Sequence, residues 1–185
     1  MRSFWGALVL LTGALVTTVS AQTETPVHEG MGGSQHVRTD WAVMGAKVSV
    51  VYGRPFLKGR PENEVMPPGR LWRTGADEAT TLTTDRPLHF GKLTVPAGTY
   101  TLYTVPGADQ WQLIFSKSTG QWGIPYPEDQ DLARVPMLVA KLSRPAEQLT
   151  ISIEPTYSRY NTEDGGVLTI EWGTISARAN FVVGK

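Results

Sequence analysis

Apolar and polar residues alternate with a period of two along most of the chain, as they do in half-buried β-strands. The pattern is clearest in Ala46–Tyr52 (AKVSVVY) and in Thr99–Val105 (TYTLYTV), where Tyr100 and Leu102 share one face. No segment keeps the 3.6-residue period of an amphipathic helix, and only residues 128–134 are predicted to form a short helical turn. The other predicted strands are Ala79–Thr84, a hairpin over Leu88–Val95, Trp111–Phe115, Pro136–Leu142, Leu149–Ile153, Val167–Trp172 and Ile175–Val182.

Short turn motifs separate these strands. PAG, PGAD and EDGG each lie between two predicted strands, and Gly, Pro and Asp are residues that tight turns favour. Many short strands joined by turns are typical of an all-β fold. We therefore predict a single-domain antiparallel β-sandwich or jelly roll over residues 45–185. Its two long loops, Gly53–Arg70 and Ser116–Pro136, are of a length that is uncommon in compact domains and often functional.

The N-terminus has the pattern of a secretory signal peptide, which we assign to residues 1–21. Arg2 supplies a positive charge, Phe4–Val16 is apolar except for Gly and Thr residues, and Ala21 ends the small-residue sequence VSA. The apolar run is shorter than the roughly 20 residues that a membrane span needs. We predict cleavage near Ala21 and a periplasmic or secreted protein without a transmembrane segment. Residues 22–44 would then be a flexible leader with room for a first strand, since they begin with a polar, turn-rich stretch.

Composition narrows the classes of function. The chain has 17 Lys and Arg against 17 Asp and Glu, so charge gives no reason to expect a nucleic acid or an anionic membrane as partner. It has no cysteine, which excludes disulfides, thiol catalysis and cysteine-bound metals. Phosphate-binding glycine loops, serine-hydrolase motifs and the HExxH motif are also missing, so no cofactor is predicted.

Histidine is scarce, which bears on metal binding. His28 and His36 lie in or beside the predicted leader, and His89 lies in a predicted strand. A three-histidine zinc site would need the leader to be ordered. We expect instead a solvated leader and an ordinary strand histidine, and therefore predict no metal site.

A group of arginine, aromatic and acidic residues is the strongest candidate for a site. Arginine grips carboxylates with two parallel hydrogen bonds, and tryptophan and tyrosine offer flat faces with one polar tip. Such groups suit a non-catalytic binding module for a small polar or saccharide ligand. The candidate ligand-binding residues are Tyr52, Arg54, Arg60, Trp72, Arg73, Glu78 and Trp122.

Two alternatives remain open. Glu78 and Glu171, both at strands beside aromatic residues, are weak candidates for the acid and base of a hydrolase of cell-envelope material or polysaccharide. In the other alternative, Arg54, Arg73 and Glu78 form one buried ion-pair network in a structural or assembly protein.

Several motifs together resemble the bacterial domain of unknown function 2911 family. They are YGRP at Tyr52, KGR at Lys58, LWRTGADEAT at Leu71, PAGTYTLYTVPG at Pro96, WxLIF at Trp111 and QWG at Gln121. The resemblance runs from about Gly45 to Trp172 and implies an exported bacterial β-rich domain. It implies no substrate or reaction. It marks as motif-bearing positions Arg54, Arg60, Trp72, Arg73, Thr74, Gly75, Glu78 and Trp122.

Overall fold

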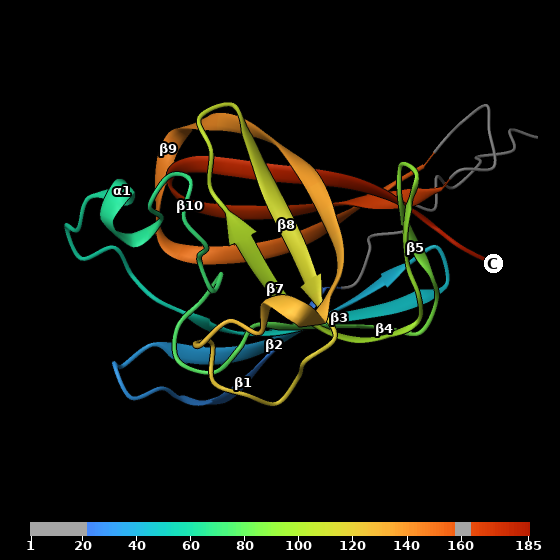
Figure 1. Ribbon diagram of the computed structural model, residues 1–185, viewed down its shortest axis with the longest axis horizontal. Helices are drawn as coiled ribbons and strands as arrows, with labels where there is room; N and C mark the ends of the chain where they lie inside the picture. The colour runs from blue at the N-terminus through green and yellow to red at the C-terminus, as the bar shows by residue number, and fades with distance from the viewer. Residues whose placement is uncertain (1–21, 158–163) are drawn as a thin grey trace, which may run out of the picture.

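The computed structural model describes residues 22–157 and 164–185, and the predicted signal peptide lies outside these ranges. The described residues confirm the predicted all-β antiparallel fold. Figure 1 shows the strands, with the short helix α1 lying among the loops. The elements are β1 (Thr23–Glu29), β2 (Gln35–Val43), β3 (Ala46–Arg54), α1 (Glu62–Val65), β4 (Thr81–Thr84), β5 (Leu88–Phe90), β6 (Leu93–Val95), β7 (Gly98–Val105), β8 (Gln110–Ser116), the 3₁₀ turn η1 (Glu128–Gln130), β9 (Asp131–Thr156) and β10 (Gly165–Val183).

The described strands form one continuous antiparallel sheet in the order β1-β2-β3-β4-β7-β8-β9-β10-β5-β6. Most neighbours in this order are also neighbours in the sequence, and the predicted turn PGAD joins β7 to β8. The hairpin predicted over 88–95 is confirmed as β5 and β6, which pair around Gly91-Lys92. The short helical turn predicted over 128–134 is limited to η1, because β9 begins at Asp131.

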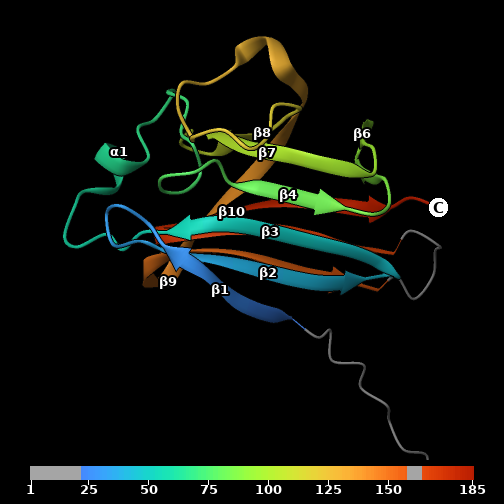
Figure 2. The same ribbon diagram turned by 90° about the horizontal axis from the view of Figure 1, so that it is seen from below.

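The long strands β9 and β10 allow the sheet to fold over on itself. The start of β9 pairs with β8, and a later part of it meets the end of β3, where the Leu149 N–H donates to the Pro55 carbonyl at 3.0 Å. Figure 2 shows β9 and β10 lying across from β2 and β3. The sequence predicted two separate strands in each of these segments, but the ladder continues through irregular pairing around Gly173. The two halves of the sheet therefore face each other as the layers of a sandwich do.

The core lies between these two halves. Tyr52 is fully buried and its hydroxyl accepts a hydrogen bond from the Ile151 N–H at 3.0 Å, which ties β3 to β9. Trp72 packs in parallel on Trp172, with ring centroids 5.7 Å apart. Apolar burial of this extent is the main stabilising term in a chain without disulfides. Other fully buried core residues include Leu82, Leu102, Leu113, Phe115 and Leu168.

Part of the segment that was predicted as a flexible leader is an ordered strand, β1. Residues 23–29 pair with β2 in an antiparallel ladder, although all seven are exposed. Backbone hydrogen bonds to β2 therefore hold this edge strand, and its sequence carries no apolar alternation that would have revealed it. The turn to β2 is closed by a 2.8 Å hydrogen bond from the Gly30 N–H to the Ser34 carbonyl. Within the described residues no helix is long and apolar enough to span a membrane.

Candidate functional site

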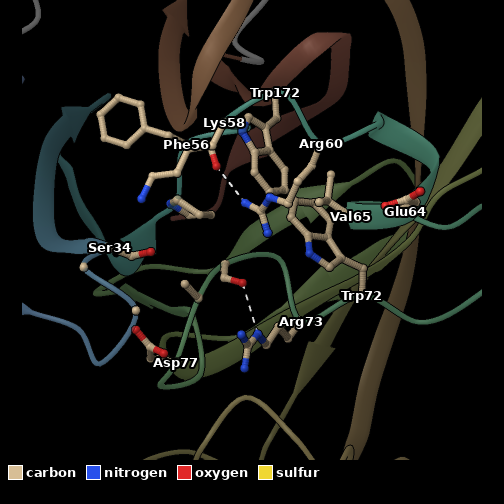
Figure 3. A pocket seen from close by; sticks show the side chains of 15 residues that line it. Ser34, Phe56, Lys58, Arg60, Glu64, Val65, Trp72, Arg73, Asp77 and Trp172 are labelled. Carbon is tan, nitrogen blue, oxygen red and sulfur yellow. Dashed lines mark hydrogen bonds between the residues drawn. The ribbon is translucent and has the colours of Figure 1, made fainter.

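A cleft of about 470 Å³ opens where the first long loop meets the loop after Trp72. Its charged lining consists of Lys58, Arg60 and Arg73 together with two carboxylates, those of Glu64 and Asp77. Figure 3 shows Arg60 beside the two indoles, with Arg73 and Asp77 on the other side of the opening. The volume is within the range of small-molecule binding pockets. The remaining lining residues are Gly32, Gly33, Ser34, Pro55, Phe56, Val65, Trp72, Gly75, Ala76 and Trp172.

Trp72, Trp172 and Arg60 build the aromatic wall of the cleft. The Arg60 guanidinium lies 5.9 Å from the centroid of the Trp172 ring, within range of a cation–π interaction. Arg60 also donates from Nε to the Leu57 carbonyl at 2.9 Å and from Nη2 to the Phe56 carbonyl at 2.7 Å. These bonds position the guanidinium but leave its positive charge uncompensated.

Among the described residues, the side-chain charges of the cleft's cations form no ion pair, although the Lys58 backbone N–H donates to the Glu147 carboxylate at 2.8 Å. Within residues 22–157 and 164–185, Arg73 makes one side-chain hydrogen bond, from Nε to the Gly75 carbonyl at 3.2 Å. In the described part of the chain, no carboxylate lies within 4 Å of the charged nitrogens of Lys58, Arg60 or Arg73. The side chains of these three residues therefore leave donors free for an acidic ligand.

The loop between Trp72 and β4 is held in an unusual conformation. Thr74 and Asp77 have φ values of +57° and +59°, a left-handed region in which a residue other than glycine costs on the order of 1–3 kcal/mol. Buried hydrogen bonds offset this cost. Thr74 Oγ1 lies 3.1 Å from Thr104 Oγ1, and the Thr80 hydroxyl donates to the Thr74 carbonyl at 3.0 Å. The turn is thereby fixed and directs the side chain of Asp77 to the edge of the cleft.

A cluster of two histidines and two carboxylates lies at that edge. The Nε2 atom of His28 is 3.3 Å from Oε1 of Glu78. The Nε2 atom of His36 is 3.3 Å from Oε2 of Glu78 and 3.5 Å from Oδ2 of Asp77. The two imidazole rings are stacked with centroids 4.4 Å apart. We call these four residues the histidine–carboxylate cluster.

The inner part of this cluster is buried and lacks hydrogen bonds. His36 is 2% exposed, and neither its Nε2 nor the Asp77 Oδ2 has a hydrogen-bond partner. Gly30 and Gly53 pack against the same atoms: a Cβ on Gly53 would lie 2.7 Å from His36 Nε2, and one on Gly30 would overlap Asp77 Oδ2. Only glycine leaves space for the His36 ring at these two positions.

The pKa of Glu78 lies below its ordinary value. The first cause is a hydrogen bond from its own backbone N–H, and the neighbouring His36 and His28 lower the pKa further. The Glu78 side chain is about half exposed, so water reaches this outer part of the cluster. The Glu78 carboxylate is therefore charged at neutral pH.

Comparison with known proteins now identifies the family. The family model described as Protein of unknown function (DUF2911) matches residues 34–181. The chain belongs to the DUF2911 family. The match covers the cleft-forming loops and three members of the histidine–carboxylate cluster, whereas His28 on β1 lies before it. No curated protein and no solved structure matches the chain.

The DUF2911 chain brings together only part of the predicted site. Arg60, Trp72 and Arg73 line the cleft, and Glu78 joins the histidine–carboxylate cluster. Trp122 is 40% exposed and lies opposite Glu78 in an isolated β-bridge.

The other predicted residues lie elsewhere. Tyr52 is a core residue whose pKa is raised, first by burial. Arg54 donates to both carboxylate oxygens of Glu24 at 3.0 Å. Glu171 accepts a hydrogen bond from the Ser176 hydroxyl at 3.0 Å and is not among the residues that line the cleft.

Sequence reasoning missed several residues of the site. No sequence pattern predicts Lys58 or Asp77 as cleft residues, and Trp172, although it belongs to the same group of aromatic and acidic residues, is not among the predicted ligand-binding residues. The sequence does not predict that His28 and His36 meet, because their proximity depends on the pairing of β1 with β2, in which they are direct partners. The register of an edge strand without apolar alternation is not readable from the sequence.

Proposed function

We propose that this DUF2911 chain is an exported, non-catalytic module that binds a small acidic ligand, such as an acidic saccharide, in the cleft. The observation that carries the proposal is that Lys58, Arg60 and Arg73 line one cleft without a carboxylate partner for any of their charges among the described residues. Export follows from the predicted signal peptide and belongs to the same proposal.

The chemistry of the lining supports an acidic ligand with a flat apolar face. A guanidinium presents a fork of donors that matches a carboxylate in two parallel bonds. The cleft-facing indoles add apolar surface on which a sugar ring can stack. Backbone carbonyls hold Arg60 in place before a ligand arrives, which reduces the entropy lost on binding.

The geometry favours binding over the two alternatives. A glycosidase needs two carboxyl groups that flank one bond in a shared cleft, but neither Glu78 nor Glu171 is among the residues that line this one. The buried ion-pair network is not formed either, because Arg54 pairs with Glu24 and Arg73 pairs with a backbone carbonyl.

Calorimetric titration with matched sugars tests the proposal. The purified protein is titrated with uronic acids and with N-acetylmuramic acid, and in parallel with the corresponding neutral sugars. We expect binding of at least one acidic sugar and much weaker binding of its neutral counterpart. If neutral sugars bind as well as acidic ones, or if no acidic sugar binds, the proposal is wrong.

Charge-removing variants locate the ligand. Arg73→Gln and Arg60→Gln remove a charged donor worth about 1.5–3 kcal/mol, so the Kd should rise roughly 10- to 100-fold. Arg144→Gln is the matched control, because Arg144 is an exposed arginine on β9 that does not line the cleft. Equal losses in all three variants would show that the effect is one of net charge and would contradict the assignment of the cleft.

A further inference from the structure

We propose that the histidine–carboxylate cluster is a binding site for a divalent transition-metal ion, with Zn²⁺ as the best-suited ion. Its ligands are one imidazole nitrogen each of His28 and His36 and a Glu78 carboxylate oxygen, which lie within 4.8 Å of one another, and the Asp77 Oδ2 lies beside them, 3.5 Å from His36 Nε2. The proposal is independent of the acidic ligand proposed above, since it concerns different side chains and a different probe.

The spacing of the donor atoms fits a metal shell. Zinc binds imidazole nitrogen and carboxylate oxygen at about 2.0–2.2 Å, so two ligand atoms of a tetrahedral site are roughly 3.3–3.5 Å apart. The distances from Glu78 to His28 and to His36 are both 3.3 Å, and that from His36 to Asp77 is 3.5 Å. Each of these three contacts is as short as one edge of such a tetrahedron; the two contacts of Glu78 use its two different oxygens, Oε1 toward His28 and Oε2 toward His36.

The buried atoms of the cluster require a partner that the protein itself does not supply. His36 Nε2 and Asp77 Oδ2 are both buried and both lack a hydrogen bond. An unpaired buried polar atom is costly, and native structures rarely keep two of them side by side. One cation between them satisfies both atoms, since the nitrogen lone pair and the carboxylate oxygen are both metal ligands.

An ion pair between protonated His36 and the two carboxylates is the competing explanation. It accounts less well for the geometry, because the contacts of His36 Nε2 do not meet the geometry of a hydrogen bond and are longer than the 2.7–2.9 Å of a charge-assisted one. A metal ion takes both rings in their neutral form.

The fold assembles these ligands from separate segments. The pairing of β1 with β2 places His28 directly opposite His36, and the strained turn after Trp72 brings in Asp77 and Glu78. Two neutral imidazoles with one or two carboxylates match the donor sets of zinc and of non-haem iron(II), whereas calcium and magnesium prefer oxygen alone. The proposal departs from our sequence-based expectation of no metal site, which rested on a leader without structure.

Half-exposed ligands make this an open rather than a closed site. The side chains of His28 and Glu78 are 45% and 47% exposed, so solvent reaches the outer side of the cluster. Asp77 also lines the cleft, which places the ion at the edge of the cleft. Metal sites with fewer than four protein ligands and access from outside bind water or a small ligand at the remaining position.

Metal titration of the tag-free full chain tests the proposal. The protein is treated with EDTA, dialysed and titrated with ZnCl₂ alone in competition with a chromophoric chelator, and bound metal is counted by mass spectrometry. We expect one equivalent of Zn²⁺ per chain. Loading with Co²⁺ should produce the visible absorption bands of a four- or five-coordinate site with nitrogen and oxygen ligands.

Variants of the ligands decide where the metal binds. His36→Ala, His28→Ala and Glu78→Gln should each raise the Kd for Zn²⁺ on the order of 100-fold or more, since even outer-shell changes cost 10- to 100-fold. His28 and Glu78 are half exposed, so their variants remain informative if His36→Ala does not fold. His89→Ala is the matched control, because the third histidine contacts Thr94 on the β5–β6 hairpin and should bind Zn²⁺ as the unaltered protein does.

Three outcomes would overturn the metal site. They are the lack of stoichiometric Zn²⁺ binding, binding that the His28 and Glu78 variants leave unchanged, and binding that His89→Ala reduces as much as they do. None of these results would affect the acidic-ligand titration, because Arg60 and Arg73 are not metal ligands. Conversely, a negative sugar titration would leave the Zn²⁺ result standing.

Discussion

Replacing Arg54 by alanine should affect mainly stability, whereas replacing Arg73 by alanine should affect mainly ligand binding. Arg54 has a side chain that is 15% exposed; it donates to the Leu149 carbonyl at 3.2 Å, to the Thr150 hydroxyl at 3.3 Å and to Glu24 at 3.0 Å. Arg73 makes one hydrogen bond, to the Gly75 carbonyl. We expect Arg54→Ala to lower stability with ligand binding retained, and Arg73→Ala to lower ligand binding with stability nearly retained.

The magnitudes follow from these contacts. The two hydrogen bonds of Arg54 to β9 contribute about 1 kcal/mol each, and the pair with the half-exposed Glu24 contributes roughly 0.5 kcal/mol. Arg54→Ala should therefore cost about 2–3 kcal/mol, and Arg73→Ala about 1 kcal/mol or less. For a chain of this length 1 kcal/mol corresponds to a change of about 2–4 °C in Tm. The expected decreases are roughly 4–12 °C for Arg54→Ala and below about 4 °C for Arg73→Ala.

Urea unfolding followed by tryptophan fluorescence measures both changes. The chain has six tryptophans, and a shift of the midpoint with an unchanged slope reports stability alone. If Arg73→Ala loses as much stability as Arg54→Ala, Arg73 has a structural partner and the argument from uncompensated cations is wrong. If Arg54→Ala leaves the midpoint unchanged, its bonds between β3, β1 and β9 do not contribute as described.

Three further predictions test the packing around the site. Tyr52→Phe should lower the free energy of unfolding by about 1–3 kcal/mol in urea unfolding, because the buried β9 amide that donates to its hydroxyl loses its partner; an unchanged midpoint would contradict this. Gly53→Ala should lower the free energy of unfolding by about 1–3 kcal/mol, because the new Cβ would lie 2.6 Å from a backbone oxygen of the strained turn. Gly32→Ala is the control and should leave the stability unchanged, because open space surrounds its Cβ. The pKa of Tyr126 is raised to about 12 by burial and then by its hydrogen bond to Asp131, above the unfolded value of about 10. The contribution of Tyr126 to stability is therefore complete below about pH 10 and lost as the pH rises through 12. The difference in the free energy of unfolding between the unaltered protein and Tyr126→Phe should be smaller at pH 11.5 than at pH 8. An equal difference at the two pH values would refute the raised pKa.

Local patterns were sufficient to predict the strands of the core. Alternation in TYTLYTV and AKVSVVY identified β7 and β3, and the hairpin around Gly91-Lys92 was recognised from its turn. Such predictions succeed because successive side chains of a strand point to opposite faces, although residues 100–104 of β7 are buried on both faces. The same reasoning missed β1, whose seven residues are all exposed and are held by backbone pairing with β2 and by contacts of Glu24 and His28 with distant segments.

The residues of the candidate site were likewise predicted only in part from the sequence. The types of residue in LWRTGADEAT indicated an arginine and indole site, and Arg60, Trp72 and Arg73 do line one cleft. Their sequence did not indicate that Arg54 would leave this group to pair with Glu24 on β1. The partner of a charged side chain depends on which distant segments of the chain lie near it in the fold. Residue types alone do not give the distances between such segments.

The amino-acid sequence by itself determined the strand content, the turns and the residue types that the site uses, because these depend on side-chain periodicity and on local backbone preferences. The tertiary structure alone decided that β1 is the edge of the sheet, that His28 lies opposite His36, and that Asp77 and Glu78 meet them. Strand register and loop approach are set by hydrogen bonds and packing between segments far apart in the chain, and these long-range contacts bring the histidine–carboxylate cluster to the edge of the cleft.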